Sequence, residues 1–534
     1  MNPEQEHLAD LSVGNVLVIA PAGCGKTEAI AGRARAVLLR GDVVAPRTIL
    51  SLTFSNKAKE NLAQRMRTIV GAGWRQRLVV TNFHGLAARV IKAHGRVVGI
   101  TEGVVFPEES WRRQVRADLG ITYKNGDDFE EALRLAKAGP YDDDEVMTRL
   151  TKYGNCAAIA YEERLRSEDR LDYDDLLRHA ARTLTVEGVS RLYRAHFGMT
   201  MVDEVQDMSL LQFEMVRAVG GDKVTYAGDP AQGIYSFAGA DPVEVFKRIR
   251  ALDPVVVEFN QSYRSAPAVL RAVNALAAQM GSTQLVCADP TRWTDAGHVL
   301  SVERSDRAEE ASALLVLIDK LAADPSVTIG IVGRRGSRAN DLREAARRAG
   351  VTFEDWAMPT HVPAIVELLK HCVNEAASAQ TLADDQLNRL GDLCRSQVDS
   401  ADPEMLNDLA AAPDVLRGMV DEGMSLRDAV RLCHSSAAPG APVAPGVHVL
   451  TGHKGKGQEF DWVFVVGLEA GHIPDFRSHT DEAQAEELRI LHVMVSRARY
   501  GVVVTFVRQD GWRATSPSPW LDVLRSVATH MNHE

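Results

Sequence analysis

The sequence predicts an α/β protein with two tandem parallel-sheet domains, each interrupted by a helical insertion. Three features predict this fold class: recurring short apolar runs, helix-like stretches between them, and two long regions without such runs. The runs are rich in β-branched residues and end at polar or turn residues, as do strands buried on both faces of a parallel sheet. They lie at Val16–Ala20, Ile49–Thr53, Leu78–Thr81, Met199–Val202, Val224–Ala227, Val255–Phe259, Ile329–Val332, His448–Thr451, Trp462–Gly467 and Gly501–Val507.

Helical stretches such as Lys57–Val70 and Leu86–His94 separate many of these runs, which favours two α/β domains in tandem. Residues from about 100 to 195 and from about 360 to 440 are expected to be helical insertions, and Ala437–Gly446 has the composition of a linker. The expected division is a first domain at residues 1–99 and 196–252 with an insertion at 100–195, and a second domain at 253–358 and 446–534 with a reduced insertion at 359–445.

Composition sets limits on the class of protein. A chain of 534 residues is too long for one core, and 45% hydrophobic with 25% charged residues is ordinary for a globular protein. No run approaches the ~20 apolar residues of a membrane span, and the polar, acidic N-terminus argues against a secretory signal. The six scattered cysteines argue against a structural zinc, an iron–sulfur cluster or a disulfide framework, and favour a cytoplasmic location.

The net charge of −11 does not by itself indicate a nucleic-acid binder, although a local basic groove would suffice for one.

A phosphate-binding loop follows the first apolar run. Pro21–Thr27 reads Pro-Ala-Gly-Cys-Gly-Lys-Thr between a strand and a helix, where glycines let backbone N–H groups surround phosphates at a helix N-terminus. Lys26 would neutralise the β- and γ-phosphates of ATP, and Thr27 would hold Mg²⁺. The competing interpretation is a glycine-rich turn with a chance Lys-Thr pair. The expected nucleotide-binding positions here are Ala22, Gly23, Cys24, Gly25, Lys26, Thr27 and Glu28.

Two further strand ends carry candidate catalytic residues. Asp203 and Glu204 follow Met199–Val202, where a P-loop enzyme keeps its metal ligand and the base that activates water; alone, they would equally fit a solvated acidic turn. After Val224–Ala227 come Gln232, a candidate γ-phosphate sensor, and the aromatics Tyr235 and Phe237. Aromatics in such a loop either fill the core or stack on bases.

In this order the segments resemble the UvrD/Rep/PcrA branch of superfamily 1 DNA helicases, which have two RecA-like domains. Asn2–Gln5 resembles the Q motif, with Gln5 as the adenine reader, and Thr53–Ala58 resembles motif Ia. Phe83–Leu86 resembles motif Ib, and Asp172–Leu177 is similar to the family's DFDDLL segment. The strand-contacting positions that this resemblance implies are Phe54, Asn56, His84, Tyr235, Phe237 and His453.

The second half continues the resemblance. Ser262–Ser265 resembles motif IV, His453–Phe460 motif V, and Val495–Ala498 motif VI. The resemblance implies that Tyr263 stacks on adenine, Arg264 reaches the γ-phosphate, Glu459 binds the ribose and Arg497 is a second arginine finger.

The implied function is an ATP- and Mg²⁺-dependent motor that moves 3′ to 5′ on single-stranded DNA, including at a duplex junction, with ATP between the two RecA-like domains. The chain departs from the family pattern at several positions, among them Glu28, where relatives often carry an arginine near the base. Ala238 in place of a motif III arginine and the small second insertion favour an alternative, a nucleotide-gated DNA-sensing ATPase subunit that regulates a partner nuclease. Helicase-like subunits of antiviral defence systems of the Gabija type have a similar compact architecture. An RNA-directed motor has little support beyond the shared core.

Overall fold

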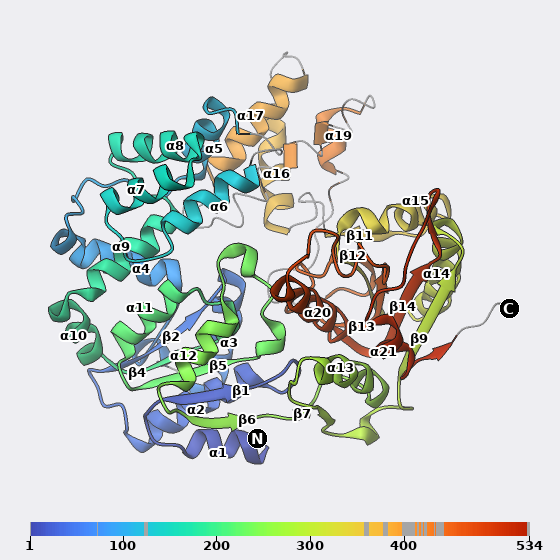
Figure 1. Cartoon of the computed structure of the whole chain (residues 1–534), viewed down its shortest axis with the longest axis horizontal. Coiled ribbons are helices and arrows are strands. Elements are labelled where there is room, and N and C mark those ends of the chain that lie inside the picture. The colour runs from blue at the N-terminus through green and yellow to red at the C-terminus, as the bar shows by residue number, and fades with distance from the viewer. Residues whose placement is uncertain are drawn as a thin grey trace. The chain divides into compact units, whose positions relative to one another are not determined.

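The computed structural model describes residues 2–530 except 72, 122–125, 357–362, 378–382, 398–408, 410–411, 414–415, 418–419, 421–423, 432 and 434–442. The chain divides into two compact units. Of the residues that the structure describes, the first unit comprises 2–20 and Gly25–Phe259, and the second comprises Pro21–Cys24 and those from 260 to 530. Each unit has its own large parallel sheet with helices packed around it, which confirms the predicted α/β class (Figure 1).

The first unit is built on a six-stranded parallel sheet in the order β3-β2-β4-β5-β1-β6. Strands β1, β4 and β5 are buried along their whole length, which explains their continuous apolar sequences. The strands are β1 (Val16–Ile19), β2 (Thr48–Thr53), β3 (Leu78–Asn82), β4 (Phe197–Val202), β5 (Val224–Gly228) and β6 (Val255–Glu258).

Helices cover this sheet, and most of them begin at a residue whose side chain caps the helix N-terminus. Ser209 caps one of them and accepts a hydrogen bond from the Gln212 N–H, while the Gln212 side chain returns to the Ser209 N–H. The helices are α1 (Pro3–Asp10), α2 (Lys26–Arg40), α3 (Asn56–Val70), α4 (Phe83–His94), α9 (Tyr173–Thr185), α10 (Glu187–His196), α11 (Leu210–Gly220) and α12 (Pro242–Arg250).

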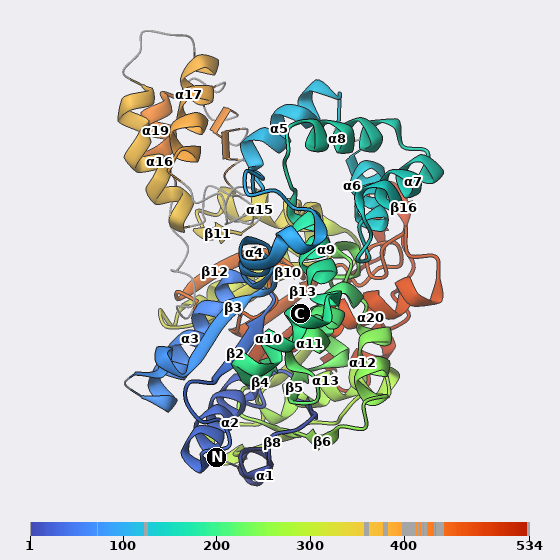
Figure 2. The same cartoon turned by 90° about the vertical axis from the view of Figure 1, so that its left-hand side faces the viewer.

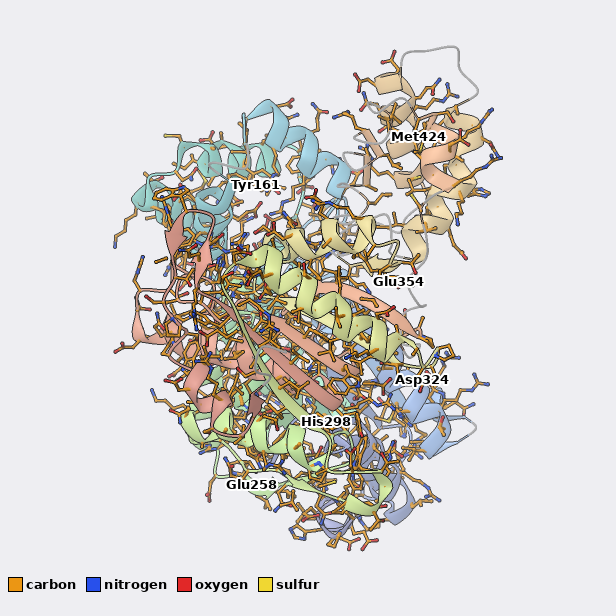
Figure 3. All side chains as sticks on the ribbon, turned by 90° about the vertical axis from the view of Figure 1, so that its right-hand side faces the viewer. Tyr161, Glu258, His298, Asp324, Glu354 and Met424 are labelled. Carbon is orange, nitrogen blue, oxygen red and sulfur yellow. The ribbon has the colours of Figure 1, made fainter. Side chains whose placement is uncertain are left out.

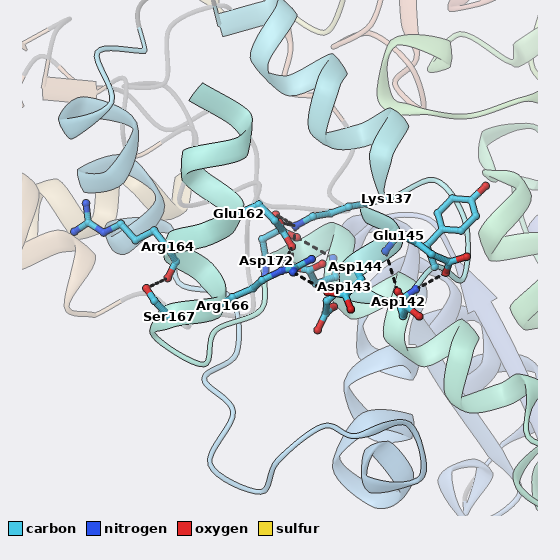
Figure 4. Close-up of polar contacts among 12 residues, drawn as sticks. Lys137, Asp142, Asp143, Asp144, Glu145, Glu162, Arg164, Arg166, Ser167 and Asp172 are labelled. Carbon is cyan, nitrogen blue, oxygen red and sulfur yellow. Dashed lines mark hydrogen bonds and ion pairs between the residues drawn. The ribbon is translucent and has the colours of Figure 1, made fainter. Parts of the chain in front are cut away.

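A group of helices without long strands lies within the sequence of the first unit. Its helices are α5 (Glu109–Asp118), α6 (Gly126–Ala136), α7 (Asp143–Tyr153) and α8 (Cys156–Ser167), which gather in one group in both Figure 1 and Figure 2. Lys137, just after α6, is buried, and its Nζ lies 2.8 Å from a carboxylate oxygen of each of Glu162, Asp172 and Asp175. Figure 4 shows Lys137 extending toward Glu162 and Asp172. One ammonium group therefore joins the end of α6, the helix α8 and the start of α9.

The second unit is built on a seven-stranded parallel sheet in the order β11-β12-β10-β13-β14-β9-β17. Its centre is apolar, with β10 and most of β13 and β14 buried. The strands are β9 (His298–Arg304), β10 (Thr328–Gly333), β11 (Phe353–Asp355), β12 (Gly446–Thr451), β13 (Phe460–Val466), β14 (Ala498–Val507) and β17 (Thr529–His530). Two short pairs lie outside it: β7 (Gln261–Ser262) with β8 (Val286–Cys287), and β15 (Gln509–Asp510) with β16 (Arg513–Ala514).

The helices of the second unit include a small separate cluster. Helices α16 (Pro363–Ala376), α17 (Ala383–Arg395) and α19 (Leu426–Arg431) share an apolar core that includes Leu369 and Leu390. These three helices are grouped together in both views (Figure 1, Figure 2). The remaining helices are α13 (Pro267–Gln279), α14 (Arg307–Ala322), α15 (Asn340–Arg348), α20 (Asp481–Val495) and α21 (Leu521–Arg525).

The structure differs from the sequence-based expectation at several strands. The predicted runs did not include β11, β17 or the strands of the two short pairs. Strand β9 was not among the predicted runs, although it pairs with β14. Strand β6 follows the expected boundary at residue 252 but pairs with β1 of the first sheet. The four-part domain division remains a prediction. Along the described chain, no helix combines the length and the apolar character needed to cross a membrane.

Candidate nucleotide and strand-binding sites

The phosphate-binding loop lies between β1 and α2, as the sequence predicted. Gly23 and Gly25 have φ angles of 84° and 75°, in the left-handed region that glycine tolerates without strain. Gly25 is the N-cap of α2, so the loop leads directly into a helix N-terminus. A Cβ atom at Gly25 would lie 2.8 Å from Nε2 of Gln5, which shows how closely the predicted adenine reader approaches this loop. Between the two glycines, Cys24 is fully buried.

Lys26 lies between two carboxylates. Its Nζ is 2.6 Å from Oε1 of Glu204 and 3.3 Å from Oδ1 of Asp203. Burial lowers the pKa of Lys26, but the attraction of Asp203 and Glu204 outweighs burial and holds the pKa above its ordinary value. Burial, reinforced by repulsion from Glu204, raises the pKa of Asp203 although Lys26 opposes the shift. The three charges therefore form one tightly linked cluster.

The residues present fit a Mg²⁺ ion at this cluster. The Thr27 hydroxyl lies 3.4 Å from Oδ2 of Asp203, so two oxygen ligands of the kind that Mg²⁺ prefers are adjacent. Among the described residues no group of three or more His, Cys, Asp or Glu side chains is arranged to hold a metal. That finding is compatible with Mg²⁺, because at phosphate sites the ion takes only one or two protein ligands together with phosphate and water.

Glu204 adopts an unusual backbone conformation. Its φ of 59° and ψ of 47° place a non-glycine residue in the left-handed region, directly before a short 3₁₀ turn, Val205–Asp207. The Glu204 N–H donates a 2.9 Å hydrogen bond to Oδ1 of Asp203, and its carboxylate accepts a hydrogen bond from the Gln206 amide. Strained conformations of this kind concentrate at functional sites, where the surrounding structure holds them in place.

Gln206 connects the acidic pair to the predicted phosphate sensor. While its Nε2 donates to Glu204, its Oε1 accepts a 3.0 Å hydrogen bond from the Asp229 N–H. Asp229 Oδ2 then accepts a 2.7 Å bond from Nε2 of Gln232. The sequence analysis singled out Glu204 and Gln232 but missed Gln206 and Asp229, which join them. The signal available in the sequence was that Gln206 lies close to Glu204 and Asp229 lies close to Gln232.

The N-terminal helix α1 is tied to the P-loop helix. Asn2 and Gln5 form a capping box, in which Asn2 Oδ1 accepts from the Gln5 N–H and Gln5 Oε1 accepts from the Asn2 N–H. Arg33 on α2 is fully buried and donates to the carbonyls of Leu8 and Leu11 near the end of α1. The sequence analysis did not identify Arg33, because an arginine in a helix is usually exposed.

Three predicted strand-binding aromatics lie together in the first unit. The rings of Phe54 and Tyr235 stack with centroids 5.6 Å apart and planes 13° apart, and Phe237 meets Tyr235 edge-on at 5.9 Å. Phe237 is 66% exposed, so this cluster is not a core plug. His84 does not join it in any described ring contact but packs edge-on against Tyr173. Asn56 begins helix α3, and its side chain lies outside the described part of the structure.

In the second unit, the predicted arginines lie beside the predicted ribose ligand. Arg264 donates from Nε to Oε1 of Glu459 at 2.8 Å, and its Nη1 donates to the Ser496 carbonyl at 3.2 Å. Burial raises the pKa of Glu459, but Arg264 outweighs burial and holds that pKa below its ordinary value. Arg497 is buried and donates to the Val493 carbonyl and to Oγ of Ser496.

The two remaining predicted contacts of the second unit are Tyr263 and His453. Tyr263 is 43% exposed, as a ring available for stacking requires, and its carbonyl accepts a 3.0 Å bond from Arg292. His453 lies in the loop between β12 and β13. In the first unit, Glu28 stands where relatives often carry an arginine, and its carboxylate forms an ion pair with Arg65 at 3.3 Å.

Comparison with known proteins gives a consistent assignment. Residues 1–251 match the UvrD/REP helicase N-terminal domain, and residues 361–509 match the UvrD-like helicase C-terminal domain, so the two matches cover more than half of the chain. The chain is 28% identical to the ATP-dependent DNA helicase UvrD2 of Mycobacterium tuberculosis over 95% of its own length and 79% of that protein. It is also 28% identical to UvrD1 of the same species, over 66% of this chain and 49% of the relative, and to Rep of Salmonella typhimurium, over 52% and 43%. The chain therefore belongs to the UvrD-like family of superfamily 1 helicases, a class of ATP-hydrolysing enzymes.

Proposed function

We propose that this protein is an ATP-dependent DNA helicase that moves 3′ to 5′ along single-stranded DNA. The observation that carries the proposal is the contact of Lys26 with both Asp203 and Glu204, which assembles a phosphate-binding cation and two acids in one cluster. The relatives' names, which describe ATP-dependent DNA helicases, agree with this assignment.

Hydrolysis in this proposal depends on residues of the first unit. Lys26 and the N–H groups at the start of α2 bind the phosphates of ATP. Thr27 and Asp203 hold Mg²⁺, which neutralises charge on the phosphates. Glu204 accepts a proton from the attacking water, and the hydrogen bond from Gln206 orients its carboxylate for this step. Gln5 reads the adenine from its place beside Gly25.

Residues of the second unit complete the proposed reaction. Arg264 and Arg497 stabilise the negative charge that develops on the γ-phosphate, as guanidinium groups do in related phosphoryl transfers. Glu459 holds Arg264 in the structure, and both could serve the nucleotide, Arg264 at the phosphate and Glu459 at the ribose. Tyr263 supplies the exposed ring that stacks on the base.

The chain itself links hydrolysis to strand binding. Gln232, at the end of the hydrogen-bonded path from Glu204, lies three residues before Tyr235, which stacks on Phe54. We propose that a change at Glu204 or Gln232 during hydrolysis reaches the aromatic cluster along this hydrogen-bonded path and the three residues that follow Gln232. We propose that Phe54, Tyr235 and Phe237 stack on bases, with Asn56, His84 and His453 contributing polar contacts to the strand.

Translocation and its polarity are tested with labelled oligonucleotides. A 3′-to-5′ motor delays the fluorescence change of a dye at the 5′ end, and the delay grows with oligonucleotide length, whereas a dye at the 3′ end shows no such dependence. The reverse pattern would contradict the polarity. A delay independent of length at both ends would contradict translocation itself.

A second candidate function rests on Ala238. This exposed residue lies in the 3₁₀ turn Ser236–Ala238 beside the aromatic cluster, at the position where relatives carry an arginine. A methyl group offers no charge to a phosphate, which favours a DNA-sensing ATPase subunit that controls a partner nuclease, for example in antiviral defence. Purification from the native host that recovers no nuclease, together with length-dependent translocation, would exclude this alternative.

A further inference from the structure

We propose that Trp356 and His448 are positioning residues for the loop Gly452–Glu459. Through them the loop is connected to the residues just before and just after the second helical insertion. This inference rests on the proposed function only where it assigns the loop a contact with DNA, through His453. The structural part of the inference concerns the second unit alone.

The loop connects β12 to β13, which lie on either side of β10 in the sheet, and it has a folded backbone. The Gly455 N–H donates to the Thr451 carbonyl at 2.9 Å, and the Lys456 N–H donates to the His453 carbonyl at 3.2 Å. The Gln458 N–H donates to the Gly455 carbonyl at 3.0 Å. These bonds define the shape of the loop, and the Gly452 N–H donates to the Gly333 carbonyl of β10 at 3.0 Å, which attaches the first residue of the loop to the sheet. The residues after Gly452 need a further fixed point.

Trp356 provides that fixed point. It follows β11 directly, and its N–H donates to the Val449 carbonyl of β12 at 2.9 Å, so its backbone extends the sheet. Its carbonyl accepts a 2.8 Å hydrogen bond from Nζ of Lys454, the residue after His453. The loop is therefore anchored to the sheet next to its predicted strand contact.

The Trp356 ring contacts both ends of the loop. Its Nε1–H donates a 3.0 Å hydrogen bond to Nδ1 of His448, which lies on β12 before the loop. Its centroid is 6.0 Å from that of Phe460, the first residue after the loop, and the rings of Phe460 and His448 are 5.7 Å apart. One indole thus supports the start and the end of the same loop.

His448 connects this arrangement to Ala444, which follows the insertion. It is 1% exposed, and its Nε2 is 2.8 Å from the Ala444 carbonyl. Because Nδ1 accepts from Trp356, these partners assign the ring proton to Nε2, which donates to Ala444. Oε2 of Glu354, a residue of β11 labelled in Figure 3, lies 3.4 Å from Nδ1.

Trp356 and Ala444 stand on either side of the chain segment that contains α16, α17 and α19. A single imidazole therefore holds the residues before and after the insertion, and the backbone carbonyl of the tryptophan that it binds anchors Lys454. The far end of the loop is Glu459, which pairs with Arg264. Movement of the chain at Trp356 or at Ala444 would therefore displace this loop. The loop carries both His453, the predicted DNA contact, and Glu459, the predicted ribose contact.

The first test measures the loop without DNA. Trp356→Phe keeps the aromatic packing and removes the indole N–H, and His448→Leu removes both imidazole hydrogen bonds. Each variant is expected to speed amide hydrogen exchange of Gly455, Lys456 and Gln458 about threefold to tenfold, the effect of one lost hydrogen bond. His448→Gln, whose amide can both donate and accept, is expected to restore most of the protection. Unchanged exchange at these amides in Trp356→Phe would overturn the proposal whatever the protein's activity.

The second test measures DNA-dependent ATP turnover. Trp356→Phe is expected to raise the single-stranded DNA concentration for half-maximal turnover about threefold to tenfold, with kcat at saturating DNA changed less than twofold. Trp111→Phe is the matched control, since it removes an indole bond to Glu168 in the first unit's insertion, and it should shift neither quantity. A fall in kcat with no change in the half-maximal concentration would contradict the positioning role. If the wild-type protein shows no DNA stimulation while the exchange result holds, the proposed function fails and the loop support stands.

Discussion

The ammonium of Lys26 lies 2.6 Å from Oε1 of Glu204, the acid that we assign as the base for water. The same ammonium is 3.3 Å from Asp203, so one cation offsets the repulsion between two neighbouring carboxylates. Glu204 has in addition a hydrogen bond from Gln206 and a left-handed backbone. The Lys26 ammonium, the Gln206 amide and the backbone conformation of Glu204 thus together determine the position of its carboxylate, as a well-oriented base requires.

Replacement of Glu204 by Gln separates proton transfer from nucleotide binding. Glutamine keeps the size and one acceptor oxygen but cannot accept the proton at neutral pH. We expect kcat for ATP to fall about 10²- to 10⁴-fold, with little change in the ATP concentration for half-maximal binding. The measurements are steady-state hydrolysis and equilibrium binding of a fluorescent ATP analogue. Glu214→Gln, an exposed position on α11, is the control, and an equal loss in both variants would refute the assigned role.

Loss of the Tyr235 ring tests the strand-binding surface. Tyr235→Ala removes the partner of Phe54, and a base stacked on an aromatic side chain contributes about 1–3 kcal/mol. We expect single-stranded DNA affinity, measured by fluorescence anisotropy, to fall about 5- to 150-fold while ATP affinity is kept. Tyr153→Ala, an exposed tyrosine on α7, serves as the control. Unaltered DNA affinity in Tyr235→Ala would remove the aromatic cluster from the proposed DNA site.

Lys137 is expected to be critical for the first insertion. Lys137→Met leaves the carboxylates of Glu162, Asp172 and Asp175 buried without their shared cation. Removal of one partner from a buried ion pair costs about 3–5 kcal/mol, and hydrogen exchange in α6, α8 and α9 should report a loss of this size. Lys152→Met, at an exposed position on α7, should leave the protection unchanged. Equal protection in the two variants would mean that the network does not stabilise the insertion.

The same network predicts a pH dependence of stability. Burial and repulsion from Asp175 raise the pKa of Asp172 from 3.8 to about 7 although Lys137 opposes the shift. Lys137 and Arg178 outweigh burial at Asp175 and hold its pKa below the ordinary value, so Asp175 stays ionised in this range. Because folded Asp172 retains its proton to a higher pH than the unfolded chain does, its contribution to stability declines as pH rises from 3.8 to about 7.

Asp172→Asn should remove this decline. Asparagine keeps an oxygen for the Asp175 N–H and carries no charge. In urea unfolding, the stability of the variant relative to wild type should therefore improve from pH 5 to pH 8, by at most about 1.4 kcal/mol per pH unit. Parallel stability profiles of the two proteins would show that Asp172 does not titrate in this interval.

The sequence predicted the buried strands because their continuous apolar runs are local features. It missed β9, since polar and charged residues interrupt the apolar ones in His298–Arg304 and leave no continuous apolar run. It also could not place β6, because pairing with β1 joins residues far apart in the chain. Strand register and sheet order depend on such distant partners, which composition does not reveal.

For the sites, the resemblance named residues whose local segments are distinctive, such as Lys26 and Glu204. It did not indicate that Arg264 and Glu459, 195 positions apart, would pair with each other. Nor could Lys137 and His448 be distinguished from ordinary surface and strand residues, because their importance arises from burial and from partners on other elements.

The Lys26 cluster is expected to hydrolyse ATP in response to single-stranded DNA. The most direct measurement is steady-state ATP turnover with and without a single-stranded oligonucleotide, in wild type and in Lys26→Ala. We predict a many-fold rise with DNA in wild type, a weaker response to RNA of the same sequence, and no turnover above background in Lys26→Ala. A rate that no nucleic acid alters, or one that persists in Lys26→Ala, would contradict the claim.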